Sequence, residues 1–175
     1  MKKLVLIGYM GAGKTTIGKR LSQKLQIPFY DTDSYIEEKQ GQCISDIFAK
    51  YGEEYFRCLE TECLKELLEQ ERDGVLSTGG GLPLRRENRE LLRQMGCTVY
   101  LQVSKDTILE RLKEDVTRPL LQVADRERKI EEMLQVRHPV YMETADLTLV
   151  VDRRDIDGIA QEILDRFYAK HQKQR

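Results

Sequence analysis

Residues 4–20 read LVLIGYMGAGKTTIGKR, and the change of character within this stretch decides how the fold begins. The apolar run at 4–7 has the composition of a buried strand. A turn that contains three glycines follows, and Lys14 comes directly after the last of them. Beyond Lys14, apolar residues return at the three- and four-residue spacing of a helix. The stretch therefore predicts a strand, a glycine-rich turn and a helix in immediate succession.

The turn matches the phosphate-binding pattern G-x-x-x-x-G-K-[ST], the P-loop, with GYMGAGKT at residues 8–15. Glycine lets several backbone N–H groups converge on one anion, and the helix that follows adds its free N–H groups and positive dipole end. Lys14 can reach the β- and γ-phosphates of a nucleotide, and the Thr15 hydroxyl can bind Mg²⁺. We therefore predict a triphosphate site. Its ATP-binding residues are Gly11, Ala12, Gly13, Lys14, Thr15 and Thr16.

Length and charge limit the possible functions. The chain has 175 residues, which fits one domain with a substantial core. With 29 Lys and Arg against 30 Asp and Glu, the net charge of -1 gives no electrostatic reason to expect nucleic acid or a membrane as partner. No apolar run approaches the roughly 18 residues of a membrane span. The run at 4–7 enters a glycine turn instead of a cleavage site. We expect a cytoplasmic protein.

Cysteine and histidine provide no metal-binding pattern. The four cysteines lack the spacing of a zinc or redox site, so we expect reduced thiols that pack as small apolar side chains. They are Cys43, Cys58, Cys63 and Cys97. The two histidines, His138 and His171, are far apart in the sequence, and we expect them at the surface or in the C-terminal tail.

Five strand-like runs alternate with helical patterns along the chain. The runs lie at 3–7, 28–31, 74–77, 97–103 and 147–151. Such alternation predicts an α/β fold with a mainly parallel, five-stranded sheet and helices on both faces. Ligands of these sheets bind at the carboxyl ends of the strands, so we expect the functional residues just after each strand.

Two segments depart from this alternation. Residues 33–72 read as a long, helix-rich insertion between the second and third strands. Residues 113–126 are polar at both ends and contain Pro119, which suits a mobile loop better than a helix. The guanine-reading motif N-K-x-D of GTPases does not occur in the sequence, and the chain is short for a motor ATPase. A small-metabolite or nucleotide kinase is the natural class.

Six motifs occur in order along nearly the whole chain: GYMGAGKTTIGKRL, FYDTDSYIE, FRCLE, LSTGGG, TRPLL and RHPVYMETA. With this set the sequence resembles the shikimate kinase family. The resemblance implies a three-layer α/β/α P-loop NTPase fold like that of nucleoside monophosphate kinases. It implies one kinase domain over 1–175, with a substrate-binding insertion at about 33–72 and a lid at about 113–126. It also implies ATP-dependent phosphorylation of the 3-hydroxyl of shikimate, with Mg²⁺, by a monomer.

The segment DTD places Asp31 and Asp33 just past the second strand, with their side chains on one side if the segment stays extended. Asp31 could support the Mg²⁺ shell through water. Asp33 could accept the proton of an acceptor hydroxyl during phosphoryl transfer, and the matching aspartate of the family contacts the shikimate hydroxyl. The alternative is a helix cap at Asp33 or Ser34, with Glu37 nearby.

Arg57 and Arg137 match the family's ligands for the substrate carboxylate, a role that suits planar guanidinium groups. Glu60 follows Arg57 by three residues on a predicted helix and could hold that guanidinium in orientation. The alternative for Arg57 is an ordinary surface ion pair. Phe48 and Phe56 are interpreted as lining the acceptor pocket, with core packing as the alternative for either.

The segment STGGG at 77–81 follows the third strand. The resemblance implies that Gly79, Gly80 and Gly81 let backbone N–H groups approach the acceptor. Ser77 could hold a water of the metal shell. A plain loop is the alternative, although three consecutive glycines carry a conformational-entropy cost that requires a reason.

Three further arginines are assigned by the resemblance. Arg118 in TRPLL matches the lid arginine that contacts the ATP phosphates, where a cation could neutralise developing charge. Arg111 matches a position that packs on adenine. DRRDIDG at 152–158 matches the adenine loop and contains Arg153, but Ile156 stands where the family often has proline. The predicted catalytic residues are Lys14, Asp33 and Arg118.

Two other functions are compatible with a P-loop. One is another small kinase, acting on gluconate or a nucleoside monophosphate, which should lack the combination of Arg57, the triple glycine and Arg137. The other is a non-catalytic module that senses shikimate or a nucleotide. Such a module would be expected to have lost Lys14, Asp33 or Arg118, and all three are present.

Overall fold

The computed structural model describes residues 3–112 and 125–172. Most of the predicted lid, with Arg118 and Pro119, lies outside these residues, as does the side chain of His171. The predicted loop also extends too far at its C-terminal end, because Arg126 already begins a helix.

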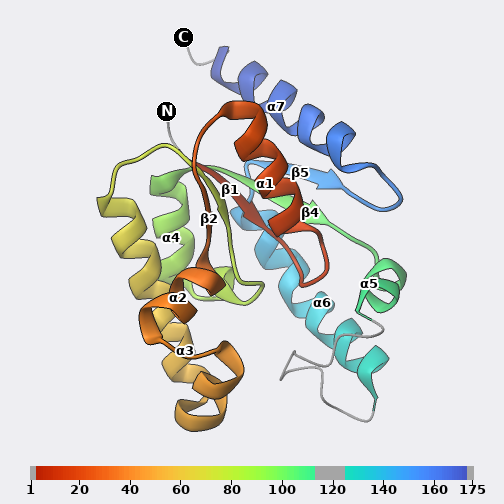
Figure 1. Cartoon of the computed structure of the whole chain (residues 1–175). Helices are drawn as coiled ribbons and strands as arrows, with labels where there is room; N and C mark the ends of the chain where they lie inside the picture. The colour runs from red at the N-terminus through yellow and green to blue at the C-terminus, as the bar shows by residue number, and fades with distance from the viewer. Residues whose placement is uncertain (1–2, 113–124, 173–175) are drawn as a thin grey trace.

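Strands and helices alternate through the described chain (Figure 1). The strands are β1 (Lys3–Ile7), β2 (Phe29–Asp31), β3 (Val75–Ser77), β4 (Gly96–Gln102) and β5 (Leu147–Val150). The helices are α1 (Lys14–Leu25), α2 (Thr32–Gln40), α3 (Ile44–Glu69), α4 (Arg86–Met95), α5 (Lys105–Arg111), α6 (Arg126–Thr144) and α7 (Ile156–Gln172), and η1 (Leu82–Leu84) is a 3₁₀ turn. Each predicted strand run overlaps an observed strand, and the predicted insertion at 33–72 coincides with α2 and α3.

The five strands form one sheet in the order β2-β3-β1-β4-β5, and every neighbouring pair is parallel. β1 therefore lies at the centre, paired with β3 on one side and β4 on the other. The chain leaves β1 toward one edge of the sheet and later crosses to the other edge, an arrangement that opens a ligand site beyond the carboxyl ends of the central strands. The predicted fold class is confirmed.

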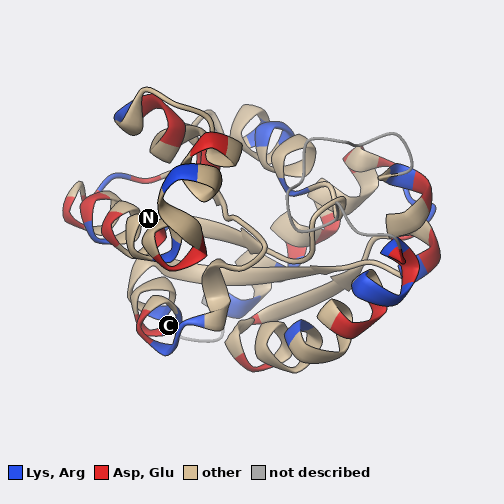
Figure 2. Ribbon diagram, turned by 90° about the horizontal axis from the view of Figure 1, so that it is seen from below, with Lys and Arg blue, Asp and Glu red and all other residues tan. Residues whose placement is uncertain are grey.

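Helices cover both faces of this sheet (Figure 1). α1 and α7 pack together on one face, while α4 and α6 contact β4 from the other, with α3 packed against α4. All five residues of β1 are buried, as expected for a parallel strand covered on both sides. Figure 2 shows Lys and Arg interspersed with Asp and Glu along the outer helices, which agrees with the balanced charge of the sequence.

The predictions for the cysteines and for one histidine need correction. Cys63 and Cys97 are buried, as expected. Cys58, within α3, and Cys43, the residue before α3 begins, are exposed. His138 is half-buried, with its Nδ1 atom 3.0 Å from the Tyr100 hydroxyl. Over the residues that the structure places, we find no helix with the length and apolar character that crossing a bilayer requires.

Candidate active site

The P-loop between β1 and α1 has the backbone of a phosphate cradle. Gly8, Gly11 and Gly13 have φ angles of 145°, 79° and 89°, which residues with a Cβ rarely adopt. At Gly8 a Cβ would also lie 2.7 Å from the carbonyl oxygen of Leu101. Lys14 begins α1, and its ammonium group donates to the carbonyl oxygens of Gly8 and Tyr9 at 2.8 and 2.9 Å. The lysine thus lies across the loop whose N–H groups would face an anion.

Thr15 and Asp31 meet beside this loop. The Thr15 hydroxyl donates to Asp31 Oδ2 at 3.0 Å. Asp31 Oδ1 accepts from the backbone N–H groups of Asp33 and Ser34, so Asp31 is the N-cap of α2. The hydroxyl and the carboxylate are therefore held together next to the predicted phosphate site.

This geometry corrects two expectations about DTD. The segment does not stay extended, because α2 already begins at Thr32. The helix cap is also neither Asp33 nor Ser34 but Asp31. As a result the two aspartates separate: Asp31 faces Thr15, and the Asp33 side chain turns toward Gly79, where a Cβ would lie 2.7 Å from its Oδ1 atom.

Side chains pack closely against two of the three glycines after β3, Gly79 and Gly81. A Cβ on Gly79 would lie 2.7 Å from both Asp33 Oδ1 and Glu60 Oε1, and one on Gly81 would lie 2.5 Å from the central carbon of the Arg57 guanidinium. None of the three has a positive φ angle. The Gly79 N–H already donates to the Thr32 hydroxyl at 2.9 Å, so it is engaged within the protein.

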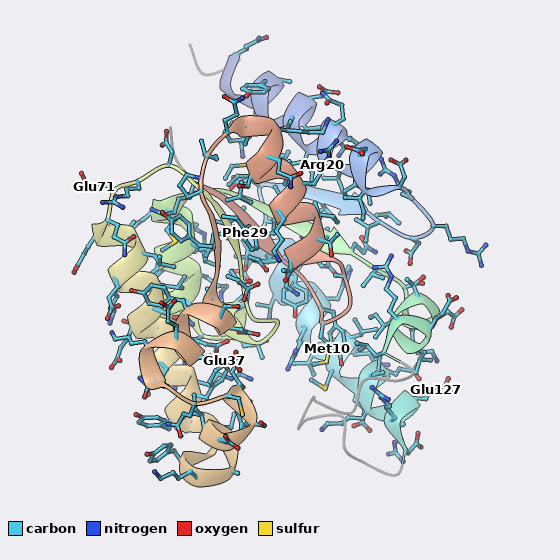
Figure 3. The ribbon with its side chains drawn as sticks, in the orientation of Figure 1. Met10, Arg20, Phe29, Glu37, Glu71 and Glu127 are labelled. Carbon is cyan, nitrogen blue, oxygen red and sulfur yellow. The ribbon has the colours of Figure 1, made fainter. Side chains whose placement is uncertain are left out.

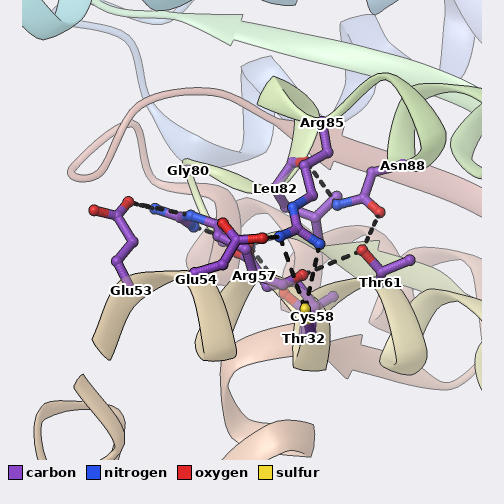
Figure 4. A network of polar contacts seen from close by, with 12 residues as sticks. Thr32, Glu53, Glu54, Arg57, Cys58, Thr61, Gly80, Leu82, Arg85 and Asn88 are labelled. Atoms are coloured by element: carbon purple, nitrogen blue, oxygen red, sulfur yellow. Dashed lines mark hydrogen bonds and ion pairs between the residues drawn. The ribbon is translucent and has the colours of Figure 1, made fainter. Parts of the chain in front are cut away.

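Arg57 is buried in a network of carboxylates (Figure 4). Its NH1 atom donates to Glu60 Oε2 at 2.8 Å, as the spacing predicts, and its Nε and NH2 atoms donate to Glu53 Oε1 at 3.2 and 2.7 Å. Arg57 is only 8% exposed and Glu60 is fully buried, so an ordinary surface ion pair is excluded. Burial raises the pKa of Glu60 to about 7, and the nearby Arg57 charge opposes that rise.

Arg137 enters the same region from α6. It is 5% exposed, and its guanidinium carbon lies 5.5 Å from the centre of the Tyr9 ring. Its NH1 atom lies 3.4 Å from the position of a Cβ on Gly80. Because Arg57 and Arg137 arrive from α3 and α6, two cations that are 80 residues apart in sequence converge on one glycine segment.

Two cavities meet at this segment. The larger cavity, of about 480 Å³, lies between the two arginines and the start of α3. It is lined by Met10, Asp33, Glu37, Cys43, Ile44, Ser45, Phe48, Phe56, Arg57, Glu60, Gly79, Gly80, Gly81 and Arg137. The smaller cavity, of about 230 Å³, lies over the P-loop. Figure 3 shows Met10 and Glu37 on opposite sides of the gap between the P-loop and α2.

The residues that line the smaller cavity are Met10, Gly11, Gly13, Lys14, Thr15, Thr16, Asp31, Asp33, Ser77, Thr78, Gly79 and Gly80. Four residues therefore line both cavities: Met10, Asp33, Gly79 and Gly80. Asp33 is the carboxylate among them. A group in the larger cavity and an anion on the P-loop would both contact this boundary.

Some predicted residues lie apart from the cavities. Ala12 is buried in the core. Arg111 donates to the Gly11 carbonyl oxygen at 2.8 Å, so it contacts the outer side of the P-loop. Arg153 is exposed, with a φ of 52°. The proposed contacts of Arg111 and Arg153 with adenine stay predictions. Arg118 lies outside the described residues.

Sequence reasoning did not find three supporting side chains. Glu53 accepts a hydrogen bond from Arg57, and the Thr32 hydroxyl accepts one from the Gly79 N–H. The Tyr141 hydroxyl donates to the Gly80 carbonyl oxygen at 2.6 Å. The spacing of Glu53 and Arg57, four residues on one helix, is a signal that could have indicated the first. For Thr32 and Tyr141 the partners are too distant in sequence to be read from it.

A divalent cation could be held where Thr15 and Asp31 meet. Within residues 3–112 and 125–172 no three His, Cys, Asp or Glu side chains gather into a cluster that could hold a metal by itself. Mg²⁺ in kinases is commonly bound by one or two protein groups together with phosphate oxygens and waters. One hydroxyl and one carboxylate beside a P-loop fit that donor set.

Comparison with known proteins identifies relatives along the whole chain. The family model described as "Shikimate kinase" matches residues 10–168. The shikimate kinase of Thioalkalivibrio sulfidiphilus is 45% identical over 97% of this chain and 88% of the relative. That of Neisseria gonorrhoeae is 50% identical over 84% of this chain and 86% of the relative.

Solved structures agree with this. Shikimate kinase from Acinetobacter baumannii, in complex with shikimate, superposes with a TM-score of 0.93 at 40% identity, covering 97% of this chain and 94% of that one. A gluconokinase from Sinorhizobium meliloti has a TM-score of 0.57 at 15% identity, covering 98% of this chain and 94% of that one, and at that identity shares the fold alone.

Proposed function

The chain belongs to the shikimate kinase family, and from this premise we propose that it transfers the γ-phosphoryl group of ATP to the 3-hydroxyl of shikimate. The observation that supports this reaction is the position of Asp33, which lies at the boundary between the two cavities and lines both of them. Phosphoryl transfer requires the attacking oxygen to lie in line with the transferred phosphorus. A carboxylate at the junction of an anion cradle and an acceptor cavity is in the right place to meet that oxygen.

On the donor side, the N–H groups of the P-loop and Lys14 hold the β- and γ-phosphates. The cation spans the loop, so it can move from the carbonyl oxygens of Gly8 and Tyr9 to phosphate oxygens without a change of backbone. Thr15 and Asp31 would hold Mg²⁺ beside the phosphates, the latter through water. When bound, the ion neutralises charge on the phosphate oxygens.

On the acceptor side, Arg57 and Arg137 bind the carboxylate of shikimate. Both guanidinium groups are buried and already fixed, Arg57 by Glu53 and Glu60, and Arg137 by packing on Tyr9 and Gly80. Little side-chain freedom is lost when the acid binds, which favours tight and oriented binding. The carboxylate end is thereby held away from the P-loop, and the ring hydroxyls lie toward Asp33.

Asp33 accepts the proton of the 3-hydroxyl as the oxygen attacks the γ-phosphorus, and ADP leaves with the electrons of the broken P–O bond. Arg118 would cover the transferring group, and Arg111 and Arg153 would contact the base of ATP. These three roles, together with a monomeric state and a cytoplasmic location, are proposed from the family resemblance.

Replacement of Asp33 by Asn tests this function. The amide keeps the size of the side chain but cannot take a proton, so kcat should fall about 10²- to 10⁴-fold while ATP binding stays near normal. Turnover is measured by coupled ADP release and ATP binding by calorimetry. Asp106→Asn, an exposed aspartate on α5 that lines neither cavity, is the matched control. A near-normal kcat for the Asp33 variant would refute its role.

A substrate panel separates the alternatives. The wild-type protein should release ADP from ATP when shikimate is added and not with gluconate or a nucleoside monophosphate. Release with gluconate instead would identify another kinase. Binding of shikimate without turnover would identify a sensing module.

A further inference from the structure

Helix α6 places a second residue, Tyr141, in contact with the wall of the larger cavity. Tyr141 lies one helical turn after Arg137 and is fully buried. Its hydroxyl donates to the Gly80 carbonyl oxygen at 2.6 Å, a short and well-formed hydrogen bond. Burial raises the pKa of this hydroxyl, and the nearby Arg137 charge opposes that rise. One buried hydroxyl therefore holds the peptide of the glycine segment and lies near a guanidinium group.

Gly80 and Arg137, the two residues beside this hydroxyl, belong to surfaces that the substrates would contact. Gly80 lines both cavities, and Arg137 lines the larger one. Arg137 is in close contact with Gly80, because its NH1 atom lies 3.4 Å from where a Cβ of that glycine would be. The hydroxyl thus fixes a peptide at the boundary of the P-loop cavity, and a cation that would bind the acid packs against that peptide.

Two neighbouring tyrosines show that burial alone does not explain this arrangement. Tyr9 and Tyr100 are also buried, and the Tyr100 ring lies 5.0 Å from that of Tyr141. The Tyr100 hydroxyl contacts His138 Nδ1, and the Tyr9 hydroxyl donates to the Met133 sulfur. Each buried hydroxyl has found a partner, as burial requires. Of these three hydroxyls, only that of Tyr141 bonds to the glycine segment, at the Gly80 carbonyl oxygen.

We propose that Tyr141 is a positioning residue for phosphoryl transfer, whose hydroxyl fixes the Gly80 peptide against which the Arg137 guanidinium packs and so sets where the carboxylate of the acceptor is bound. This proposal rests on the function proposed above. The arginine has several rotatable bonds, and the hydroxyl removes freedom that the substrate would otherwise have to restrict on binding. The role is on the acceptor side, so the interaction of the enzyme with ATP does not depend on it.

The test is Tyr141→Phe, which removes one oxygen and keeps the ring that packs on Tyr100. We expect the KM for shikimate to rise about tenfold, the loss associated with a buried hydrogen bond. The KM for ATP and the kcat at saturating shikimate should stay within about twofold. Tyr100→Phe is the matched control, because it removes an equally buried hydroxyl from the same aromatic cluster. It should lower the melting temperature by a similar amount without changing the KM for shikimate.

A double-mutant cycle with Arg137→Ala gives a second, independent readout. If Tyr141 acts through Arg137, then removing its hydroxyl in the Arg137→Ala background should change the KM for shikimate by less than about twofold. Equal effects in both backgrounds would overturn the proposal, as would a Tyr141→Phe variant with the KM of the wild type. Either result with a wild-type enzyme that phosphorylates shikimate leaves the proposed function intact. A wild type inactive on shikimate would instead overturn the function itself.

Discussion

The two cavities are built in different ways, although they share a wall. The P-loop cavity is formed largely by one continuous segment, whose glycine φ angles and helix N-terminus create the binding surface. The larger cavity is formed by side chains from α2, α3 and α6 and by the glycines after β3. A site made of local backbone can be recognised in a few residues of sequence. A site made of distant side chains depends on the packing of the whole domain.

Their electrostatics differ as well. The P-loop cavity presents Lys14 and backbone N–H groups to an anion, with Asp31 and Asp33 at one side. In the larger cavity the charges are paired: Arg57 lies between Glu53 and Glu60, and Asp33 and Arg137 stand close by. The first cavity is suited to a highly charged ligand. The second places guanidinium and carboxylate groups around one space, so a ligand with one carboxylate and several hydroxyl groups fits it better.

The largest effect is expected on the P-loop side. Lys14→Met removes the cation that spans the loop, so the developing charge on the phosphates loses a fixed partner. We expect kcat/KM for ATP to fall by about 10³ or more. Shikimate binding without nucleotide, measured by calorimetry, should be unchanged, because Lys14 does not line the larger cavity. A parallel loss of shikimate binding would show that the two cavities cannot be treated separately.

The next effect concerns the glycines that the two cavities share. Gly79→Ala would place a methyl group 2.7 Å from Asp33 Oδ1 and Glu60 Oε1, so one or both carboxylates must move. A displacement of about 1 Å in a catalytic group commonly lowers the rate about 100-fold, and we expect that loss in kcat/KM for shikimate. Steady-state assays with each substrate varied in turn are the measurement.

Gly80→Ala is the matched control for that variant. The nearest atoms to its Cβ would be Arg137 NH1 and the Gly8 carbonyl oxygen, both at 3.4 Å, and its φ angle is not positive. The change should therefore be tolerated with at most a severalfold loss. If the two alanine variants lost activity equally, clearance for Asp33 and Glu60 would not be the reason for glycine at position 79.

The P-loop side could be predicted from the sequence nearly residue by residue. The strand at 3–7, the glycine turn and the helix that follows it all follow from composition and a contiguous motif, and all three are confirmed. The parallel sheet also follows, because its strands are short apolar runs separated by helical patterns.

The larger cavity could be predicted only in part. The resemblance identified Asp33, Arg57 and Arg137, which do line one cavity. The condition that DTD stays extended is not met, because the Asp31 carboxylate stabilises a helix that begins at the next residue. The side chains that pack against Gly79 and Gly81 were missed for a related cause. The sequence around such a glycine does not show which side chain from a distant helix will pack against it.

The smallest effect is a proton linked to acceptor binding. Three groups face Glu60: Arg57 from its own helix, Asp33 from α2 and Arg137 from α6. Burial raises the pKa of Glu60 to about 7, so the carboxyl is partly protonated at neutral pH. A substrate carboxylate brought to Arg57 and Arg137 adds negative charge nearby and raises this pKa further. Binding should therefore take up a fraction of a proton, and shikimate affinity should fall severalfold as the pH rises from about 6 to 8.

Calorimetric titration with shikimate at pH 7, in two buffers of different ionisation enthalpy, measures that proton directly. Glu60→Gln should abolish the uptake, because an amide does not titrate. Glu53→Gln is the control: Glu53 contacts the same guanidinium, but its side chain is 52% exposed, so the proton uptake should persist in this variant. Uptake that survives in the Glu60 variant would assign the proton to another group. The buried carboxylate of Glu60 would then act only as a fixed partner of Arg57, and the larger cavity would owe its response to pH to a different residue.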